Sequence, residues 1–212
     1  MTAPNIQYES VDWGARYTAG DTPWDLGGPH PEFVRRVEEH LRPPAPGRLA
    51  FVPGAGRGHD ALLAAAAGWR VCAVDLAPEL TAMAGPRLRA AGVDLWIGDA
   101  LNIPADVLGA PVELFLEHTF LCALPLERRC EWGALARRLV ARGGRLVALV
   151  FPLDKPHTEG GPPWGLTPTQ FADLLGPDFE LRVDDPVAEP TGQRVWKERF
   201  CVFERTAGAP AP

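Results

Sequence analysis

The chain has 212 residues, a length that suits one globular domain, with 46% hydrophobic and 23% charged residues. A formal net charge of −6, with no basic cluster outside helical patterns, argues against nucleic-acid binding. No stretch reaches the roughly 20 apolar residues needed to span a bilayer, and the first ten residues lack the pattern of a signal peptide. We therefore expect a cytoplasmic protein that binds no membrane, and a monomer or weak homo-oligomer.

Residues 1–30 are rich in aromatic residues, glycine and proline and have no clear periodicity. We interpret them as an N-terminal cap rather than a separate domain. A helix is predicted to begin at Pro31, because apolar residues then recur at helical spacing until Pro43-Pro44 ends the pattern. A strand at Arg48–Val52 follows, and a glycine-rich turn leads into an alanine-rich helix that begins near His59.

The rest of the chain continues the alternation of strands and helices. The next predicted elements are a strand at Arg70–Val74, a helix at Pro78–Ala91 kinked at Gly85-Pro86, and strands at Val93–Ile97 and Val112–Leu116. After them come a helix at Pro125–Ala141 capped by Gly143-Gly144, a strand at Arg145–Phe151, a helix at Pro168–Leu175, and strands at Phe179–Val187 and Arg194–Glu204.

This order predicts an α/β fold, because strands that alternate with helices form a parallel sheet with right-handed crossovers. The two late strands are expected to form an antiparallel pair. We therefore predict a doubly wound, mostly parallel seven-stranded sheet with an antiparallel C-terminal strand pair, in a single domain of residues 1–206. Residues 207–212 are expected to be a disordered tail.

The main functional signal is the segment Val52-Pro53-Gly54-Ala55-Gly56-Arg57-Gly58-His59, between the first strand and its helix. Its glycines let the backbone turn sharply and approach a ligand at the helix N-terminus. A dinucleotide fingerprint needs a third glycine where His59 stands, and the Gly-Lys-Ser/Thr of a phosphate loop is absent. The Gly-x-Gly-x-Gly spacing favours S-adenosyl-L-methionine over a dinucleotide or a nucleotide phosphate. The alternative is a plain strand-to-helix turn that binds no ligand.

Two aspartates end the next two strands. Asp75 lies about 20 residues beyond the glycine loop, where a carboxylate can bind ribose hydroxyls of either NAD or S-adenosyl-L-methionine. Asp99 ends the third strand, where an adenine ring and the Ala100 amide would meet, but an aspartate there can also be a helix cap or turn former. Together they predict a nucleoside site.

Several motifs in register resemble the thiopurine, thiol and halide methyltransferases. They are Thr22-Pro23-Trp24-Asp25-Leu26-Gly27, the glycine segment through Asp60, Phe120-Leu121-Cys122-Ala123-Leu124, Phe151-Pro152 and Gly161-Pro162-Pro163-Trp164. Ala55 departs from the family's usual cysteine. The resemblance runs from about Trp13 to Val202 and implies a class I S-adenosyl-L-methionine-dependent methyltransferase.

The resemblance also implies which residues contact the cofactor. In the cap, the family's aromatic positions correspond to Trp13, Tyr17 and Trp24. The residues expected to bind the nucleoside are Gly54, Gly56, Asp75, Asp99 and Ala100. His118 stands where the family has a tyrosine. An aromatic face attracts a sulfonium, although Trp13 and Trp24 can equally anchor the cap to the core. On the acceptor side we expect a lid of Trp24, Phe120, Phe151 and Trp164, with core packing as the alternative for the two phenylalanines.

The sequence shows no nucleophile–base pair, and its five histidines have no metal-ligand spacing, so we expect neither a catalytic residue nor a metal. Methyl transfer to a small soft nucleophile such as a thiol, thiopurine, thiocyanate or halide needs only positioning and exclusion of water. Two alternatives stay open: an NAD-dependent oxidoreductase and a non-catalytic S-adenosyl-L-methionine-binding protein. Four scattered cysteines fit free thiols.

Overall fold

A seven-stranded sheet forms the centre of the computed structural model, which describes residues 11–188, 191–192 and 194–206. The strand order is β3-β2-β1-β4-β5-β7-β6. The strands are β1 (Leu49–Pro53), β2 (Arg70–Asp75), β3 (Val93–Ile97), β4 (Val112–His118), β5 (Val140–Val150), β6 (Phe179–Pro186) and β7 (Arg199–Arg205). β1 to β5 pair in parallel, whereas β7 is antiparallel to both β5 and β6, which confirms the predicted sheet.

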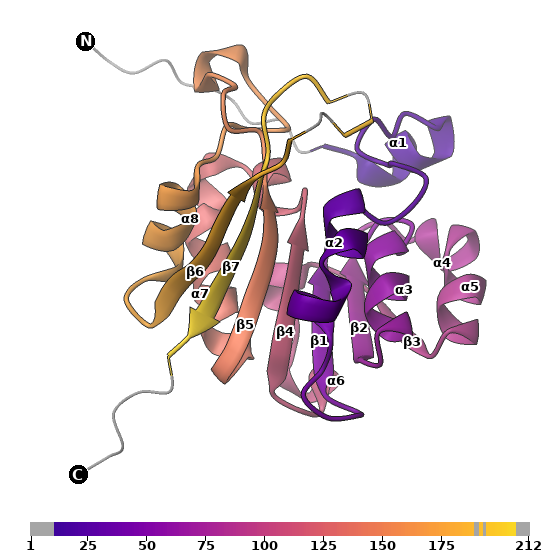
Figure 1. Ribbon diagram of the computed structural model, residues 1–212. Helices are drawn as coiled ribbons and strands as arrows, with labels where there is room; N and C mark the ends of the chain where they lie inside the picture. Colours follow the sequence, from indigo (N-terminus) through magenta and orange to yellow (C-terminus); the bar gives the residue numbers. More distant parts are fainter. Residues whose placement is uncertain (1–10, 189–190, 193, 207–212) are drawn as a thin grey trace.

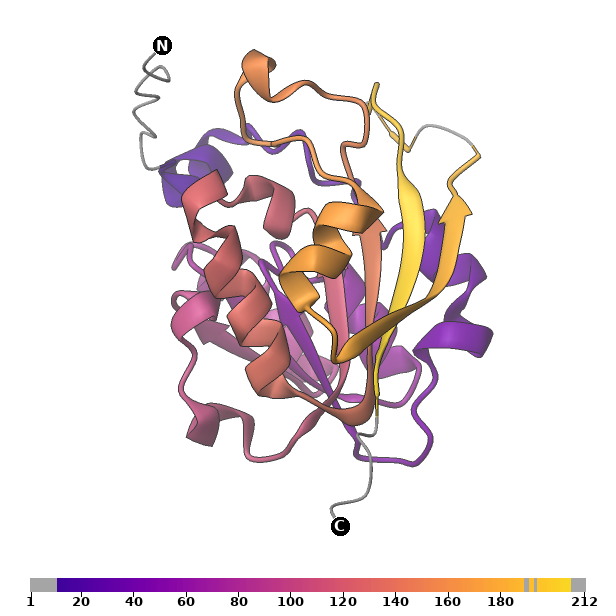
Figure 2. The same cartoon turned by 90° about the vertical axis from the view of Figure 1, so that its left-hand side faces the viewer.

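Helices cover both faces of the sheet (Figures 1 and 2). One face carries α2 (Pro31–Arg35), the π-helical turn Val37–Leu41, α3 (His59–Ala66), α4 (Leu80–Met83) and α5 (Gly85–Ala90). The other carries α7 (Arg129–Leu139) and α8 (Pro168–Leu175), with α6 (Ala105–Leu108) packed into the same cluster through Leu108. Short 3-10 turns lie at Ala100–Asn102, Leu121–Ala123, Leu126–Arg128 and His157–Glu159.

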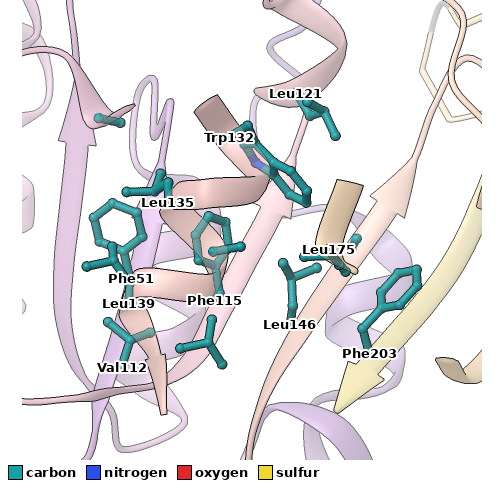
Figure 3. Packing of buried hydrophobic residues seen from close by; sticks show 14 of the residues in the cluster. Phe51, Val112, Phe115, Leu121, Trp132, Leu135, Leu139, Leu146, Leu175 and Phe203 are labelled. Carbon is teal, nitrogen blue, oxygen red and sulfur yellow. The ribbon is translucent and has the colours of Figure 1, made fainter. Parts of the chain in front are cut away.

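The two faces are built by alternation along the buried strands. In β1, Leu49 and Phe51 belong to the cluster under α7 and α8, whereas Ala50 and Val52 belong to the cluster under α2 and α3. Figure 3 shows Phe51 beside Phe115, and the Phe115 ring contacts Trp132 of α7. Burial of each such large side chain contributes about 1.5–3 kcal/mol to stability.

Several elements differ from their predicted bounds. The helix expected at Pro125–Ala141 begins at Arg129 after a 3-10 turn and ends at Leu139, and β5 starts at the next residue, so Gly143-Gly144 is not a helix cap. Gly143, with φ of +78°, instead lies in β5 where its register with β4 shifts, because Val140 already pairs with Val112. The kink expected at Gly85-Pro86 separates α4 from α5.

The part of the N-terminal cap that the structure describes contains a helix that the sequence did not reveal. This helix, α1 (Trp13–Ala19), is capped by the Asp12 carboxylate, which accepts from the Ala15 N–H, and ends at Gly20 with φ of +70°. It has seven residues and buries only Gly14 and Tyr17, too few to produce a periodic pattern. Residues 1–10 and the predicted tail 207–212 lie outside the described residues.

The carboxyl ends of the parallel strands meet at one edge of the sheet, and α1 lies at this edge (Figure 1). The segment between β5 and α8 lies at the same end of the molecule. Ligands of open α/β sheets bind at this edge. Within the described ranges, no helix combines the length and apolar character needed to cross a membrane.

Candidate active site

The glycine loop between β1 and α3 adopts a conformation that only glycine tolerates easily. Gly54 and Gly56 have φ of +58° and +54°. A Cβ atom on Gly54 would lie 2.7 Å from Cδ2 of Phe120, and one on Gly56 would lie 2.9 Å from the Tyr17 hydroxyl. The loop therefore brings bare backbone against the N-terminal cap and the segment after β4.

Asp75 ties this loop to the end of β2. Its carboxylate accepts the N–H of Gly56 at 2.8 Å and the N–H of Ala77 at 3.0 Å, and the residue is buried. Burial raises the pKa of Asp75, while the two backbone donors oppose that shift. The structure thus brings together Asp75 and the glycine loop, as the spacing predicted.

Asp99 follows the end of β3, which is beside β2, and its carboxylate makes two structural contacts. It accepts the Leu101 N–H at 3.0 Å, capping the short turn that begins at Ala100, and pairs with Nη2 of Arg128 at 2.9 Å. Burial alone would raise the pKa of Asp99, but these partners, chiefly Arg128, hold it below the usual value. The helix-cap interpretation therefore applies, and Asp99 and Ala100 lie outside the lining of the cleft between the cap and the glycine loop.

Three aromatic residues of the cap form one cluster. The Trp24 ring lies edge-on to Trp13 at 5.3 Å and to Tyr17 at 5.7 Å between centroids. The Arg16 guanidinium lies 4.5 Å from the centroid of the Trp24 ring, so one face of that ring already contacts a cation. Burial raises the pKa of Tyr17, and the nearby Asp75 carboxylate adds to this effect, so the hydroxyl stays protonated.

A half-open cleft of about 50 Å³ lies between the cap and the glycine loop. It is lined by Tyr17, Trp24, Asp25, Leu26, Gly28, Gly54, Ala55, Gly56, Arg57, His59, Asp60, His118 and Thr119. Five predicted cofactor residues are therefore gathered here: Tyr17, Trp24, Gly54, Gly56 and His118. Ligand sites usually have volumes of roughly 300–1,000 Å³. A ligand of nucleoside size therefore fits only if the cap moves outward or if the ligand extends into the open side of the cleft.

The predicted acceptor-side residues are spread over a wider region. Phe120 packs against Gly54, next to the cleft. Phe151 is buried beneath the Arg194 guanidinium, which lies 4.7 Å from its ring centroid. Trp164 is buried, and its backbone N–H donates to the Cys122 carbonyl at 2.7 Å, which joins the segment before α8 to the segment after β4.

A buried polar cluster behind the cleft was missed by sequence reasoning. His118 Nδ1 lies 2.6 Å from Oδ2 of Asp60, and His118 Nε2 lies 2.6 Å from Nη2 of Arg194. Arg194 also pairs with Glu198 at 2.6 Å, and Glu198 lies 3.2 Å from Nε2 of His30. These five residues come from four separate chain segments, so no local spacing could have revealed them.

The turn after β4 is a second feature that the sequence does not reveal. Thr119 has φ of +61°, a strained conformation for a β-branched residue. Glu117, which is buried, accepts the N–H groups of Phe120 and Leu121 at 2.9 and 3.0 Å and the indole N–H of Trp132 at 3.0 Å. These bonds hold the strained turn in place against the glycine loop.

The sheet order, its antiparallel end pair and the loop after β1 define the fold of class I methyltransferases. One solved structure with this fold is the Burkholderia thailandensis 1,6-didemethyltoxoflavin-N1-methyltransferase with bound 1,6-didemethyltoxoflavin and S-adenosylhomocysteine. The similarity has a TM-score of 0.61 at 20% sequence identity and covers 94% of this chain and 93% of that chain. The predicted fold class is confirmed.

Sequence comparison identifies the family. The model of the thiopurine S-methyltransferase family matches residues 8–199. Probable thiol methyltransferase 2 of Arabidopsis thaliana is 31% identical over 173 residues, covering 79% of this chain and 73% of that protein. Thiocyanate methyltransferase 1 of Arabidopsis thaliana is 30% identical over 199 residues, covering 91% and 83%.

The chain therefore belongs to the thiopurine S-methyltransferase family, as the motifs implied. It is an S-adenosyl-L-methionine-dependent methyltransferase. The comparisons give no support to the alternative of an NAD-dependent oxidoreductase.

Proposed function

We propose that this enzyme methylates a small soft nucleophile: a thiol, thiopurine, thiocyanate or halide. The observation that carries the proposal is that the glycine loop, the end of β2 and the N-terminal cap meet at Gly56. Its N–H donates to Asp75, and its α-carbon lies against the Tyr17 hydroxyl of the cap. A methyl donor bound at this loop would have the aromatic residues of the cap over it and Phe120 beside it. The family relatives named for thiols and thiocyanate support this acceptor class.

The residues of the glycine loop and of the β2 end fit S-adenosyl-L-methionine. The lack of side chains at Gly54 and Gly56 lets Phe120 and the Tyr17 hydroxyl approach the loop closely. The Asp75 carboxylate retains acceptor capacity for hydroxyl groups beyond its two amide donors. We propose that the cofactor contacts are Trp13, Tyr17, Trp24, Gly54, Gly56, Asp75, Asp99, Ala100 and His118. The acceptor contacts would be Trp24, Phe120, Phe151 and Trp164.

When bound, S-adenosyl-L-methionine supplies a methyl group that its sulfonium already activates for in-line displacement. The protein then has to position the acceptor and exclude water, which can account for about 7–11 kcal/mol of the barrier. Tyr17 and Trp24 line the cleft on the cap side, and Phe120 packs against Gly54 beside it. Such apolar walls favour a weakly hydrated, polarisable nucleophile over a strongly hydrated oxygen anion.

The proposal is tested by incubating the protein with S-adenosyl-L-methionine and a panel of acceptors, with S-adenosylhomocysteine as the measured product. The panel contains an alkyl thiol, an aryl thiol, a thiopurine, thiocyanate and iodide, with an alcohol and a primary amine as controls. We expect product with at least one soft acceptor and none with the controls. Binding of the cofactor without product from any soft acceptor would overturn the proposal and favour a binding protein.

We further propose a single domain over residues 1–206, in a cytoplasmic monomer or weak homo-oligomer. The single sheet with a core on each face supports one folding unit. The most exposed large apolar side chains, Val195, Leu76 and Val34, lie on different elements and do not make one patch. Sedimentation equilibrium at micromolar concentration tests the oligomeric state, and a stable dimer would refute it.

A further inference from the structure

The buried polar cluster behind the cleft has the geometry of a proton acceptor. His118 is the last residue of β4, Asp60 lies in the first turn of α3, and Arg194 lies in the connection between β6 and β7. The side chains of His118 and Asp60 are only 12% and 13% exposed, and both residues line the cleft with Gly54. The imidazole is therefore largely shielded from bulk water and adjacent to the glycine loop.

Its partners fix the tautomer of His118. A guanidinium has only donors, so the 2.6 Å contact between Arg194 Nη2 and His118 Nε2 makes Nε2 the acceptor. The proton of the neutral ring then lies on Nδ1, which donates to Asp60 at 2.6 Å. An aspartate that orients a histidine in this way leaves a basic nitrogen aimed away from it, as in the histidine–aspartate pairs of hydrolases.

That nitrogen is covered by Arg194, which leads from the ring toward the predicted acceptor side. The Arg194 guanidinium that contacts Nε2 also lies over the Phe151 ring. On its other sides the imidazole is packed edge-on against His30, at 5.2 Å between centroids, and against Phe33, at 5.8 Å. His118 and Gly54 both line the cleft, so a small acceptor in it would reach Nε2 once the Arg194 guanidinium moves off that nitrogen.

We propose that His118 takes the proton from a thiol acceptor, with Asp60 holding its tautomer and Arg194 pairing with the sulfur anion. This inference rests on the proposed function and narrows its substrate class to thiols that are mostly protonated at neutral pH. The Arg194 guanidinium first leaves Nε2 for the sulfur, which frees the Nε2 lone pair. The thiol S–H bond then breaks, its proton goes to Nε2 and its electron pair stays on sulfur. That pair then forms the bond to the methyl carbon, while the electrons of the sulfonium–methyl bond return to the sulfur of the departing S-adenosylhomocysteine.

The charges around the ring agree with this role. Asp60 and Glu198 carry two negative charges against the single positive charge of Arg194, and His30 also faces Glu198. Burial lowers the pKa of His118, Asp60 opposes that effect, and Arg194 and His30 add to it. The lowered pKa keeps the ring neutral at pH 7, the form in which Nε2 has a lone pair, and movement of Arg194 off the ring would make Nε2 more basic. Halides and thiocyanate carry no proton at neutral pH and would gain nothing from it.

The first experiment needs no turnover. An aryl thiol that ionises near neutral pH is bound to the protein together with S-adenosylhomocysteine, and the ionised fraction of the thiol is followed by ultraviolet absorbance against pH. We expect the wild-type protein to lower the pKa of the bound thiol by at least one pH unit relative to the free thiol. In His118→Gln the pKa of the bound thiol should return to the free value or above it.

The second experiment compares kcat/KM for an alkyl thiol, with a pKa of about 8.5, and for the aryl thiol at pH 8. In His118→Gln we expect kcat/KM to fall about 100-fold for the alkyl thiol. For the already ionised aryl thiol, kcat/KM should fall less than about tenfold. The matched control His30→Gln removes an imidazole from the same cluster and should leave the ratio of the two values unchanged. Asp60→Asn should shift the ratio in the direction of His118→Gln and serves as the second variant if that protein does not fold.

Equal losses for the two thiols in His118→Gln, or an unchanged pKa of the bound thiol, would overturn the inference. It would also be wrong if the wild-type enzyme methylates thiocyanate or iodide but no thiol, although the proposed function would then stand. If no acceptor is methylated at all, the proposed function fails, and the absorbance titration still tests the proton transfer on its own.

Discussion

Replacement of Glu117 by glutamine tests how the buried carboxylate contributes to stability. Glu117 accepts three N–H donors, from Phe120, Leu121 and Trp132, at distances of 2.9 to 3.0 Å. Glutamine has nearly the same shape, and its carbonyl can still accept the two backbone donors. Its amide group, however, faces the indole N–H of Trp132, and an unmet buried donor costs about 1–3 kcal/mol.

The pH dependence is the sharper part of this prediction. Burial raises the pKa of Glu117 to about 7, against the ordinary glutamate value of 4.5 that applies to the unfolded chain. The folded protein therefore binds more protons than the unfolded chain between these values, so this group's contribution to stability falls as the pH rises from about 4.5 to about 7 and is level above that. Between pH 5 and pH 8 the wild-type protein should lose about 2–3 kcal/mol relative to Glu117→Gln.

The assay is urea unfolding followed by circular dichroism at pH 5, 6, 7 and 8, for the wild type and the variant. The difference between the two free energies of unfolding cancels the other titrating groups. The matched control is Glu131→Gln at the exposed N-terminal turn of α7, whose pKa is lowered by Arg128 and which should give a difference independent of pH in this range. If the wild-type and Glu117→Gln values stay parallel from pH 5 to 8, the assignment of a raised pKa to Glu117 is wrong.

Three further predictions concern the donor site. Gly56→Ala should lower the free energy of unfolding by about 1–2 kcal/mol, because its φ of +54° is unfavourable for alanine. It should also weaken S-adenosyl-L-methionine binding in calorimetry. An unchanged stability and affinity would contradict the role of Gly56 in the proposed cofactor site. Trp24→Ala should weaken that binding by about 2- to 30-fold if its ring covers the sulfonium, and an unchanged affinity would remove Trp24 from the site. Arg128→Gln should raise the pKa of Asp99, measured by carboxyl NMR titration. It should change the free energy of unfolding by less than about 1 kcal/mol, because the ion pair is about one-third exposed. An unchanged pKa of Asp99 would contradict its pairing with Arg128.

Local signals predicted the elements that depend on local chemistry. The bounds of α8 agree with the prediction at both ends, because Thr167 and Gln170 form a capping box around Pro168 and Gly176 ends the helix. The glycine loop and Asp75 were likewise found together, since their spacing within one strand–helix–strand unit sets their geometry. In each case the information lies within about 25 residues of sequence.

Features decided by distant pairing could not be predicted in the same way. The start of β5 at Val140 depends on its partner Val112 in β4, whereas the local pattern continues that of the preceding helix. The strand expected to begin at Arg194 begins at Arg199, since Arg194 and Glu198 turn into the polar cluster instead of pairing along β7. The pairing of Asp60 with His118 spans 58 residues and follows only from the order of β1 and β4 in the sheet.

The antiparallel β6–β7 pair has a consequence for how this enzyme can diversify. In the proposed site, the donor contacts come largely from the N-terminal cap and from β1 to β3 with their loops. Phe151, Arg194 and Glu198, beside the proposed acceptor position, come instead from the segment after β5 and from the β6–β7 connection. Exchange of that connection between relatives would therefore alter which nucleophile is accepted and leave donor affinity nearly constant. Donor and acceptor selectivity can then change independently within one continuous sheet.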